Sequence, residues 1–296
     1  MSAWSATTTR LAKTFRFWQK TWRSSFYRRR PAEAARLVYA RRRFAWHTVA
    51  DRIEFLTSLG IDARAALSGL DAWWPRLQAV VAERSVAGVT KNDAFVLYAV
   101  VRSLRPDRVI ETGVAEGVSS AFIGAALLDN GHGVLHSLDL APEPAGGALR
   151  AADGSVYRWA EKGLAHLVPP EITAALGDRW QLHLGDVRQT LPALLGSLPD
   201  VDLFFHDDLH TPDHQRWEYE LVWPRIRAGG VLMSDDATHA WADFVRRHAP
   251  HADPWANFRR MTALRKPGSA SPFSARAGAA RARAASGAPR DRPRGS

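Results

Sequence analysis

The sequence predicts an α/β fold: a Rossmann-like, doubly wound and mostly parallel sheet with helices on both faces, preceded by a helical extension. Short apolar runs alternate with helix-length segments through the middle of the chain, as expected for parallel strands joined by right-handed crossover helices. The chain has 296 residues, 46% of them hydrophobic, which is enough to bury one large core. We therefore expect one large domain with appendages.

Five apolar runs are expected to form the sheet. They are Arg108–Thr112, Val134–Asp139, Trp180–Leu184, Val201–His206 and Gly230–Ser234. Helices are expected between them over Ser119–Leu128, Glu171–Leu176, Thr190–Leu195 and His214–Ile226. After the fifth run only Met261–Arg265 is a convincing strand, so this edge of the sheet is expected to be reduced or completed by another chain.

Residues 1–90 are expected to form a basic helical extension or cap, residues 91–267 the α/β domain, and residues 268–296 a disordered basic tail. Aromatic and apolar residues recur at spacings of three to four near the start of the chain, which predicts an amphipathic helix. They are Leu11, Phe15, Trp18, Trp22 and Phe26. Further helices are expected from Pro31 to about Arg43, over roughly Phe55–Ala82 and over Lys91–Ser103. The aromatic stripe suits packing on the domain or on another subunit of a homo-oligomer, and it also suits a membrane surface.

Positive charge is concentrated at the two ends of the chain. Residues 1–43 hold 12 lysines and arginines against one acid, and residues 265–296 hold eight against one. The region between them is therefore net acidic, although the whole chain carries a formal charge of +10. Enzymes of nucleic acids usually carry positive charge around the active cleft, so this distribution argues against a nucleic-acid substrate. The basic ends remain candidates for contact with an anionic surface.

The chain contains no cysteine, which excludes disulfides and thiolate metal sites and fits a reducing compartment. No apolar stretch approaches the roughly 20 residues of a transmembrane helix. Basic residues interrupt the first apolar positions, so no secretory signal is expected. A cytoplasmic location is the expectation.

A glycine turn follows the first expected strand, in the run Glu111-Thr112-Gly113-Val114-Ala115-Glu116-Gly117, and a helix comes next. Such a turn lets the main chain approach a ligand at a helix N-terminus. The spacing G-x-x-x-G lacks the third glycine of the dinucleotide fingerprint, which points away from NAD and toward another nucleoside.

Two further strand ends carry residues suited to a nucleoside. Asp139 ends the second strand, 22 residues beyond Gly117, where a carboxylate in a doubly wound fold bonds ribose hydroxyls. Gly185 and Asp186 follow the third strand and could surround an adenine edge, or Asp186 could cap the next helix. Both interpretations stay open, and both can hold together.

A second acidic cluster is expected where the fourth and fifth strands end, in His206-Asp207-Asp208-Leu209-His210 and Ser234-Asp235-Asp236. Carboxylates gathered at one edge repel each other unless a cation offsets them, and such oxygen-rich groups suit Mg²⁺ or Ca²⁺. Histidines nearby make Zn²⁺, Mn²⁺ or Fe²⁺ conceivable as well. They are His206, His210, His214 and His239. His210 could also act as a general base toward a substrate hydroxyl.

The groups at the ends of the first three strands are the glycine turn, Asp139, and Gly185 with Asp186. They resemble motifs I, II and III of the class I S-adenosylmethionine (SAM)-dependent methyltransferases. The run FFHDDLHTPDHQRWEYELVWPRIRAGGVLMSDDATHAWADF is similar to the Methyltransf_24 branch, whose relatives include macrocin-type and catechol-type O-methyltransferases. The resemblance covers roughly Glu111–Phe244 and leaves the two ends of the chain outside it.

The resemblance implies that SAM is the cofactor. The turn at Gly113 and Gly117 would hold its methionine part, Asp139 its ribose, and Asp186 its adenine. Glu111 matches the acid that opens motif I.

The resemblance further implies that Asp207, Asp235 and Asp236 bind Mg²⁺ beside the acceptor hydroxyl, with Asp207 and His210 as catalytic residues. Asp208 stands where the branch often has serine, and Pro212 replaces the usual tyrosine. The lysine base of the catechol type has no counterpart, and His210 is nearest to its place. The acceptor is expected to be a small molecule with a sugar, polyketide or phenolic hydroxyl.

Three rival functions stay open. The basic ends would suit a nucleic-acid methyltransferase, but the fourth strand ends in HDDLH rather than the Asn/Asp-Pro-Pro-aromatic motif of N-methyltransferases. A non-catalytic SAM-binding scaffold at a membrane or partner surface is the second. An Fe²⁺-dependent hydroxylase using the histidines and aspartates is the third, and it would leave the glycine turn and the ribose acid without a purpose.

Overall fold

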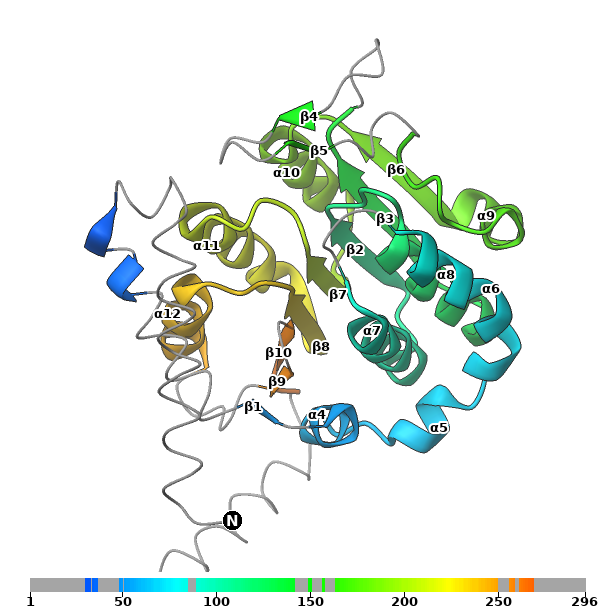
Figure 1. Ribbon diagram of the computed structural model, residues 1–296. Helices are drawn as coiled ribbons and strands as arrows, with labels where there is room; N and C mark the ends of the chain where they lie inside the picture. Colours follow the sequence, from blue (N-terminus) through cyan, green and yellow to red (C-terminus); the bar gives the residue numbers. More distant parts are fainter. Residues whose placement is uncertain are drawn as a thin grey trace, which may run out of the picture.

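The computed structural model describes residues 51–84, 89–141, 163–249 and 261–268, with the short stretches 30–32, 34–36, 48–49, 149–150, 156–157 and 256–258. A central sheet lies between two layers of helices (Figure 1). The doubly wound α/β fold expected from the sequence is confirmed.

The central sheet has eight strands among the described residues. Their spatial order is β1 (Thr48–Val49), β9 (Ala256–Phe258), β10 (Met261–Arg265), β8 (Ile226–Ser234), β7 (Val201–His206), β2 (Arg108–Thr112), β3 (Val134–Asp139) and β6 (Trp180–Leu184). The neighbours from β8 to β6 are all parallel, and β10 is antiparallel to both β8 and β9. Four of the five expected strands have the expected bounds.

The carboxyl ends of the parallel strands lie level with one another. Thr112 is in register with Leu138 on β3 and with His206 on β7, and His206 is in register with Ser234 on β8. The residues that follow these strands therefore leave the sheet along one edge, where open α/β sheets bind their ligands.

The far edge of the sheet is more complete than the sequence suggests. Both β9 and β10 are present and form an antiparallel pair, with β1 added outside β9. The expectation of a single strand in this region is wrong. Strands of two or three residues are too short to show an alternating apolar pattern in the sequence, and they join the sheet through backbone pairing with a neighbouring strand.

Two apolar cores lie on opposite faces of the sheet, because successive strand residues point to opposite sides. On β7, Leu203 and Phe205 face the first core and Phe204 faces the second. The first is covered by α4 (Arg52–Ser58), α5 (Ala63–Leu67), α6 (Leu70–Glu83), α7 (Lys91–Leu104), α8 (Val118–Asn130) and α9 (Pro170–Leu176). The second is covered by α10 (Val187–Ser197), α11 (Pro212–Val222) and α12 (His239–His248).

Local chemistry explains where these helices begin and end. Thr90 and Asp93 form a capping box at the start of α7. The helix expected over His214–Ile226 ends at Val222, because Pro224 lies in a 3-10 turn and Ile226 already belongs to β8. The helical region expected over Phe55–Ala82 is divided into α4, α5 and α6, with Gly60 at positive φ in the first break.

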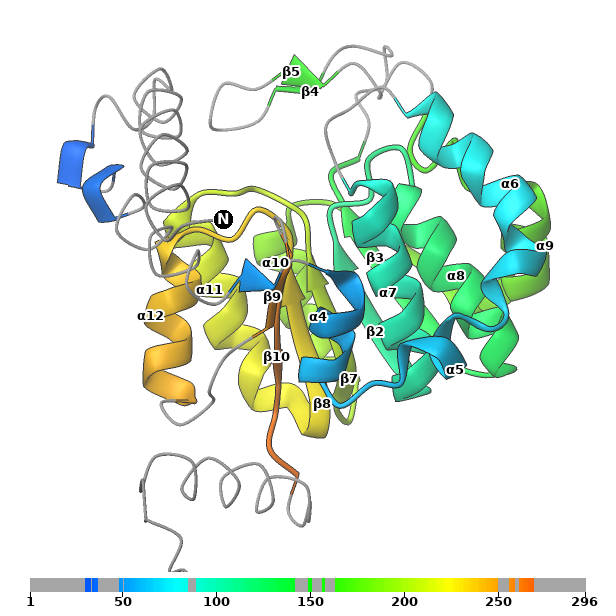
Figure 2. The same ribbon diagram turned by 60° about the horizontal axis from the view of Figure 1, so that its bottom comes forward.

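The extension adjoins the domain through α6, which contacts α8 (Figure 2). A small antiparallel pair, β4 (Leu149–Arg150) and β5 (Val156–Tyr157), lies outside the main sheet and was not expected from the sequence. Residues 31, 32 and 34–36 are helical, in line with the helix expected from Pro31. The amphipathic helix expected over Leu11–Phe26 and the tail from residue 269 lie outside the described residues. Within the described part of the chain, no helix is long and apolar enough to cross a membrane.

Candidate active site

The turn between β2 and α8 depends on its glycines. Gly113 and Gly117 have φ values of +83° and +90°, which favour glycine. A Cβ at Gly113 would overlap the carbonyl of Asp207 at the end of β7, and a Cβ at Gly117 would overlap the Val168 side chain. The turn is therefore pressed against the neighbouring strand end on one side and against residues 165–168 on the other.

Asp139 holds this turn in place. Its Oδ2 accepts hydrogen bonds from the backbone N–H groups of Val114 and Ala115, each 2.8 Å long, and its Oδ1 accepts one from Leu140 N–H at 2.6 Å. Burial raises the pKa of Asp139 to about 6 against the opposing effect of these bonds, and nearby Asp208 adds to the rise. The residue predicted to bond ribose thus lies at the turn predicted to hold the cofactor.

Glu111 is completely buried between β2, β3 and α8. Its Oε2 accepts hydrogen bonds from the hydroxyls of Ser120 (2.6 Å) and Ser137 (2.8 Å). Among the described residues no hydrogen bond reaches its Oε1, and burial raises the pKa of the carboxyl group. The nearby hydroxyl of Ser119, together with those of Ser120 and Ser137, opposes this rise.

The residues at this edge fit a nucleoside carrying an amino acid group. Glu111 and Asp139 offer acceptors, and the amino group and ribose hydroxyls of SAM are donors. This complementarity rests on the chemistry of the side chains alone.

Asp186 is the N-cap of α10 and accepts a 2.9 Å hydrogen bond from Arg188 N–H, which confirms the capping interpretation. The N–H of Gly185 donates to the carbonyl of Asp139 at 2.9 Å, which brings the end of β6 to the end of β3. Asp186 is exposed, so its carboxylate remains accessible to an adenine edge.

A buried polar network, not foreseen from the sequence, joins the end of β7 to α11. Glu218 Oε2 accepts a 2.6 Å hydrogen bond from Nδ1 of His206 and a 3.0 Å hydrogen bond from the Thr112 hydroxyl. Gln215 Nε2 lies 3.3 Å from His206 Nε2, and its Oε1 accepts from Thr238 N–H at 2.9 Å. Because Thr238 fixes the orientation of the amide, Nε2 of His206 is the acceptor and its proton lies on Nδ1.

Helix periodicity is the sequence signal for that network. Gln215 and Glu218 are three residues apart on α11, so both project toward the sheet. Gln215 Nε2 also donates to the carbonyl of Asp236 at 3.2 Å, which ties together the loops after β7 and β8.

The predicted catalytic pair lies at the same edge. His210 Nε2 is 3.4 Å from Oδ1 of Asp207, whose side chain is 12% exposed. The backbone N–H of Asp207 donates to the carbonyl of Thr112 at 2.9 Å, so the pair adjoins the glycine turn directly.

Asp235 and Asp236 follow β8, next to β7. Asp235 is buried and its N–H donates to the carbonyl of His206 at 2.8 Å, while Asp236 has a φ of +41°. The structure therefore brings Asp207, Asp235 and Asp236 to adjacent strand ends. Their role as metal ligands stays a prediction.

A different group has the close ligand spacing of a metal site. Within the described part of the chain, one ligand atom each of Asp208, His214 and Glu218 lies within 4.8 Å of the others. Burial lowers the pKa of His214, but Asp208 and Glu218 outweigh it and raise the pKa to about 9. Burial likewise raises the pKa of Glu218, and His206 and His214 outweigh it, so the pKa falls to about 2.

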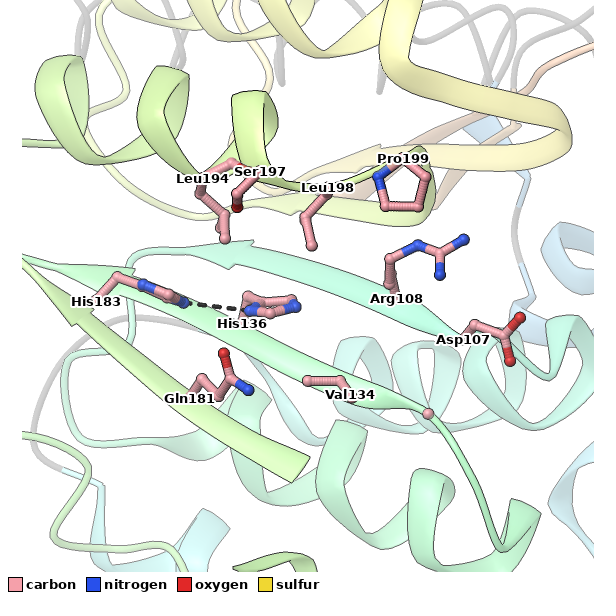
Figure 3. Close-up of a pocket in the computed structure, with 11 residues that line it drawn as sticks. Asp107, Arg108, Val134, His136, Gln181, His183, Leu194, Ser197, Leu198 and Pro199 are labelled. Atoms are coloured by element: carbon pink, nitrogen blue, oxygen red, sulfur yellow. Dashed lines mark hydrogen bonds between the residues drawn. The ribbon is translucent and has the colours of Figure 1, made fainter. Parts of the chain in front are cut away.

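A cavity of about 610 Å³ lies away from this edge, beside the starts of β2 and β3 and the end of α10 (Figure 3). His136 Nδ1 and His183 Nε2 are 3.2 Å apart in its wall. Burial lowers the pKa of His136 to about 4, with smaller effects from His183 and Arg108. None of the predicted site residues lines this cavity.

Comparisons with known proteins agree with the sequence resemblance. A family model described as a methyltransferase domain matches residues 110–237. No curated protein matches the chain.

Solved structures of methyltransferases are similar to parts of the chain. The PaMTH1 methyltransferase of Podospora anserina, bound to S-adenosylhomocysteine (SAH), is 18% identical over 63% of this chain and 69% of its own, with a TM-score of 0.39. The Bacillus cereus O-methyltransferase in complex with SAH is 14% identical over 75% of this chain and 100% of its own, with a TM-score of 0.42. The O-methyltransferase TomG of Streptomyces achromogenes, in complex with SAM, is 20% identical over 71% and 89%, with a TM-score of 0.40.

The family match spans the run from β2 through β8, which carries the glycine turn and all the predicted strand-end acids. Residues 110–237 match the methyltransferase domain, in agreement with the class I SAM-dependent methyltransferases that the sequence resembles.

Proposed function

We propose that this protein is a class I SAM-dependent methyltransferase, which transfers the methyl group of SAM to a hydroxyl oxygen of a small-molecule acceptor, such as a sugar, polyketide or phenol. The observation that carries the proposal is the His210–Asp207 pair, 3.4 Å apart, whose backbone adjoins the glycine turn. A group beside the glycine turn that can accept a proton would lie close to a substrate hydroxyl that approaches the methyl group of SAM.

The cofactor-binding residues are proposed to be Glu111, Gly113, Gly117, Asp139, Gly185 and Asp186. Asp139 would accept from the ribose hydroxyls with the edge of its carboxylate not occupied by the turn. The main task of these residues is to hold the sulfonium methyl group in line with the attacking oxygen.

The chemical step is a displacement at carbon. The acceptor oxygen forms a bond to the methyl carbon, the carbon–sulfur bond breaks with its electrons remaining on sulfur, and SAH is the product. His210 takes the hydroxyl proton, and Asp207 orients the ring and stabilises its charge.

Asp207, Asp235 and Asp236 are proposed to hold a divalent cation such as Mg²⁺. Such an ion supplies charge that lowers the pKa of the acceptor hydroxyl. The three carboxylates would position it at the ends of β7 and β8, next to the proton-accepting pair.

The remaining proposals concern the rest of the chain. Residues 1–90 are proposed to act as a cap, residues 91–267 as the catalytic domain and residues 268–296 as a basic tail. Contact of the basic ends with an anionic membrane surface, a homo-oligomeric state and a cytoplasmic location are proposed with them. The absence of cysteine supports the last of these.

The first test is calorimetric titration of SAH into the full chain and into Asp139→Ala, with and without Mg²⁺. We expect micromolar binding in the wild type and at least tenfold weaker binding in the variant. Asp107→Asn, in the loop before β2 at the opposite end of the sheet, is the matched control and should bind as the wild type does. If the wild type fails to bind SAH under either condition, the proposed function is wrong.

A further inference from the structure

We propose that Asp208, His214 and Glu218 form a binding site for one divalent transition-metal ion, such as Zn²⁺, Mn²⁺ or Co²⁺. This site shares no residue with the three carboxylates assigned to Mg²⁺ above. It lies between the loop after β7 and the first turns of α11.

The spacing of the three side chains matches a coordination sphere. His214 Nε2 lies 3.3 Å from Asp208 Oδ2 and 3.3 Å from Glu218 Oε1. Ligand atoms bound tetrahedrally to zinc at roughly 2.0–2.2 Å are separated from one another by about 3.3 Å. An ion would therefore fit between these atoms with little movement of the side chains.

The hydrogen bonding of Glu218 leaves one oxygen for such an ion. Oε2 is occupied by His206 Nδ1–H and by the Thr112 hydroxyl. Oε1 is completely buried and makes no hydrogen bond with the described residues, and neither does His214 Nε2, in a side chain only 5% exposed. These two buried polar atoms lie 3.3 Å apart as an ion pair whose geometry is poor for a hydrogen bond, and a cation bound between them would satisfy both.

Residues that do not bind the ion themselves orient one of its ligands, as is common around metal sites. His206 fixes the Glu218 carboxylate, and Gln215 in turn fixes His206, so the ligand is oriented before any ion arrives. His214 and Glu218 are four residues apart on α11 and therefore lie on one face of the helix.

Asp208 provides the route of entry and indicates the class of ion. Its side chain is 30% exposed, whereas the other two ligands are buried, so an ion would arrive from the solvent side. One imidazole nitrogen with two carboxylate oxygens favours Zn²⁺, Mn²⁺ or Co²⁺ over Mg²⁺, which prefers oxygen ligands alone. With a neutral imidazole, the two carboxylates match the charge of a divalent cation.

The other occupant of this space is a proton on His214, which would make the cluster a plain ion pair. The test is made on the full-length protein after treatment with a chelator. Zn²⁺ is titrated by calorimetry, and Co²⁺ by its visible absorption, which reports coordination independently of activity. We expect one equivalent of either ion to bind the wild type.

The variants Asp208→Asn and His214→Gln should weaken binding by 10- to 100-fold and remove the Co²⁺ spectrum. Asp208→Asn is decisive because this side chain is partly exposed, whereas a variant of Glu218 would also disturb the buried network with His206 and Thr112. Asp213→Asn is the matched control: it precedes His214 on the same helix, is 73% exposed, and should bind as the wild type does.

Any of three results would overturn the proposal. One is absence of Zn²⁺ and Co²⁺ binding by the wild type. The second is equal binding by the wild type, Asp208→Asn and His214→Gln. The third is binding that is abolished by Asp236→Asn and not by these two variants. SAH affinity is measured on the same samples, so failure of this metal site and failure of the cofactor site are seen separately.

Discussion

Asp139, at the end of β3, accepts a 2.8 Å hydrogen bond from the backbone N–H of Ala115, in the turn after β2. The same oxygen accepts an equal bond from Val114, so one carboxylate fixes the turn on which the proposed cofactor site depends. A residue predicted for ligand binding therefore also has a structural task, and the two tasks can be separated by measurement.

Asp139→Ala is expected to lower the free energy of unfolding by about 1–3 kcal/mol, because two partly buried N–H groups lose their acceptor. Chemical denaturation measures this loss. Asp186→Ala is the comparison: it removes an exposed helix cap, whose loss costs about 1 kcal/mol. Equal small losses in both variants would contradict the structural task assigned to Asp139.

Gly113→Ala is expected to destabilise the protein by more than about 2 kcal/mol, since strain at positive φ adds to overlap with the Asp207 carbonyl. Gly131→Ala is a matched control, because Gly131 has a φ of +77° but nothing within 4 Å of the added Cβ. The control should lose only about 1 kcal/mol. Thermal or chemical unfolding of both variants gives the comparison, and equal losses would show that crowding at Gly113 is unimportant.

The buried His136 predicts a dependence of stability on pH. Its pKa falls to about 4 in the folded state, while the unfolded state keeps a value near 6.5, so between these values the unfolded chain binds more protons. Stability is therefore complete above about pH 6.5 and decreases as pH falls toward 4, by roughly 1–3 kcal/mol.

His136→Gln should reduce this loss, as measured by denaturant unfolding at a series of pH values. His132→Gln, a more exposed histidine just before β3, serves as the control. An unchanged pH dependence in His136→Gln would mean that other groups cause it.

His210→Gln is expected to slow methyl transfer by about 10²- to 10⁴-fold and leave SAH affinity within twofold, because the residue is assigned to the proton and not to the cofactor. The measurement is SAH formation with an acceptor found by screening hydroxyl compounds, with a pH–rate profile of both proteins. Glu171→Gln, an exposed acid on α9, is the control. A variant with the wild-type rate and profile would remove His210 from the mechanism.

The strands of the parallel sheet could be predicted because their apolar runs are continuous and bounded by turns. β7 is buried along its whole length, and its bounds are those expected from the sequence. β9 and β1 could not be predicted, because two or three residues carry no periodicity and join the sheet only through a neighbour. Tertiary pairing, and not local propensity, decides such elements.

The candidate site shows the same division. The strand-end acids Asp139 and Asp207 could be placed from the sequence, because parallel strands end at one edge. The pairing of Glu218 with His206 could not, because it depends on the angle at which α11 packs against β7. A carboxylate in mid-helix looks like a solvated side chain until the packing is known.

The outer edge of the sheet has a consequence for how the chain folds. β1 pairs with β9, and the two are about 200 residues apart in the sequence. Contacts of such long range form late, since a large loop must close first. During synthesis, β9 therefore has to emerge from the ribosome before Thr48 and Val49 find their partner. A fragment beginning at residue 91 would leave that edge uncovered, and unpaired strand edges are starting points for aggregation.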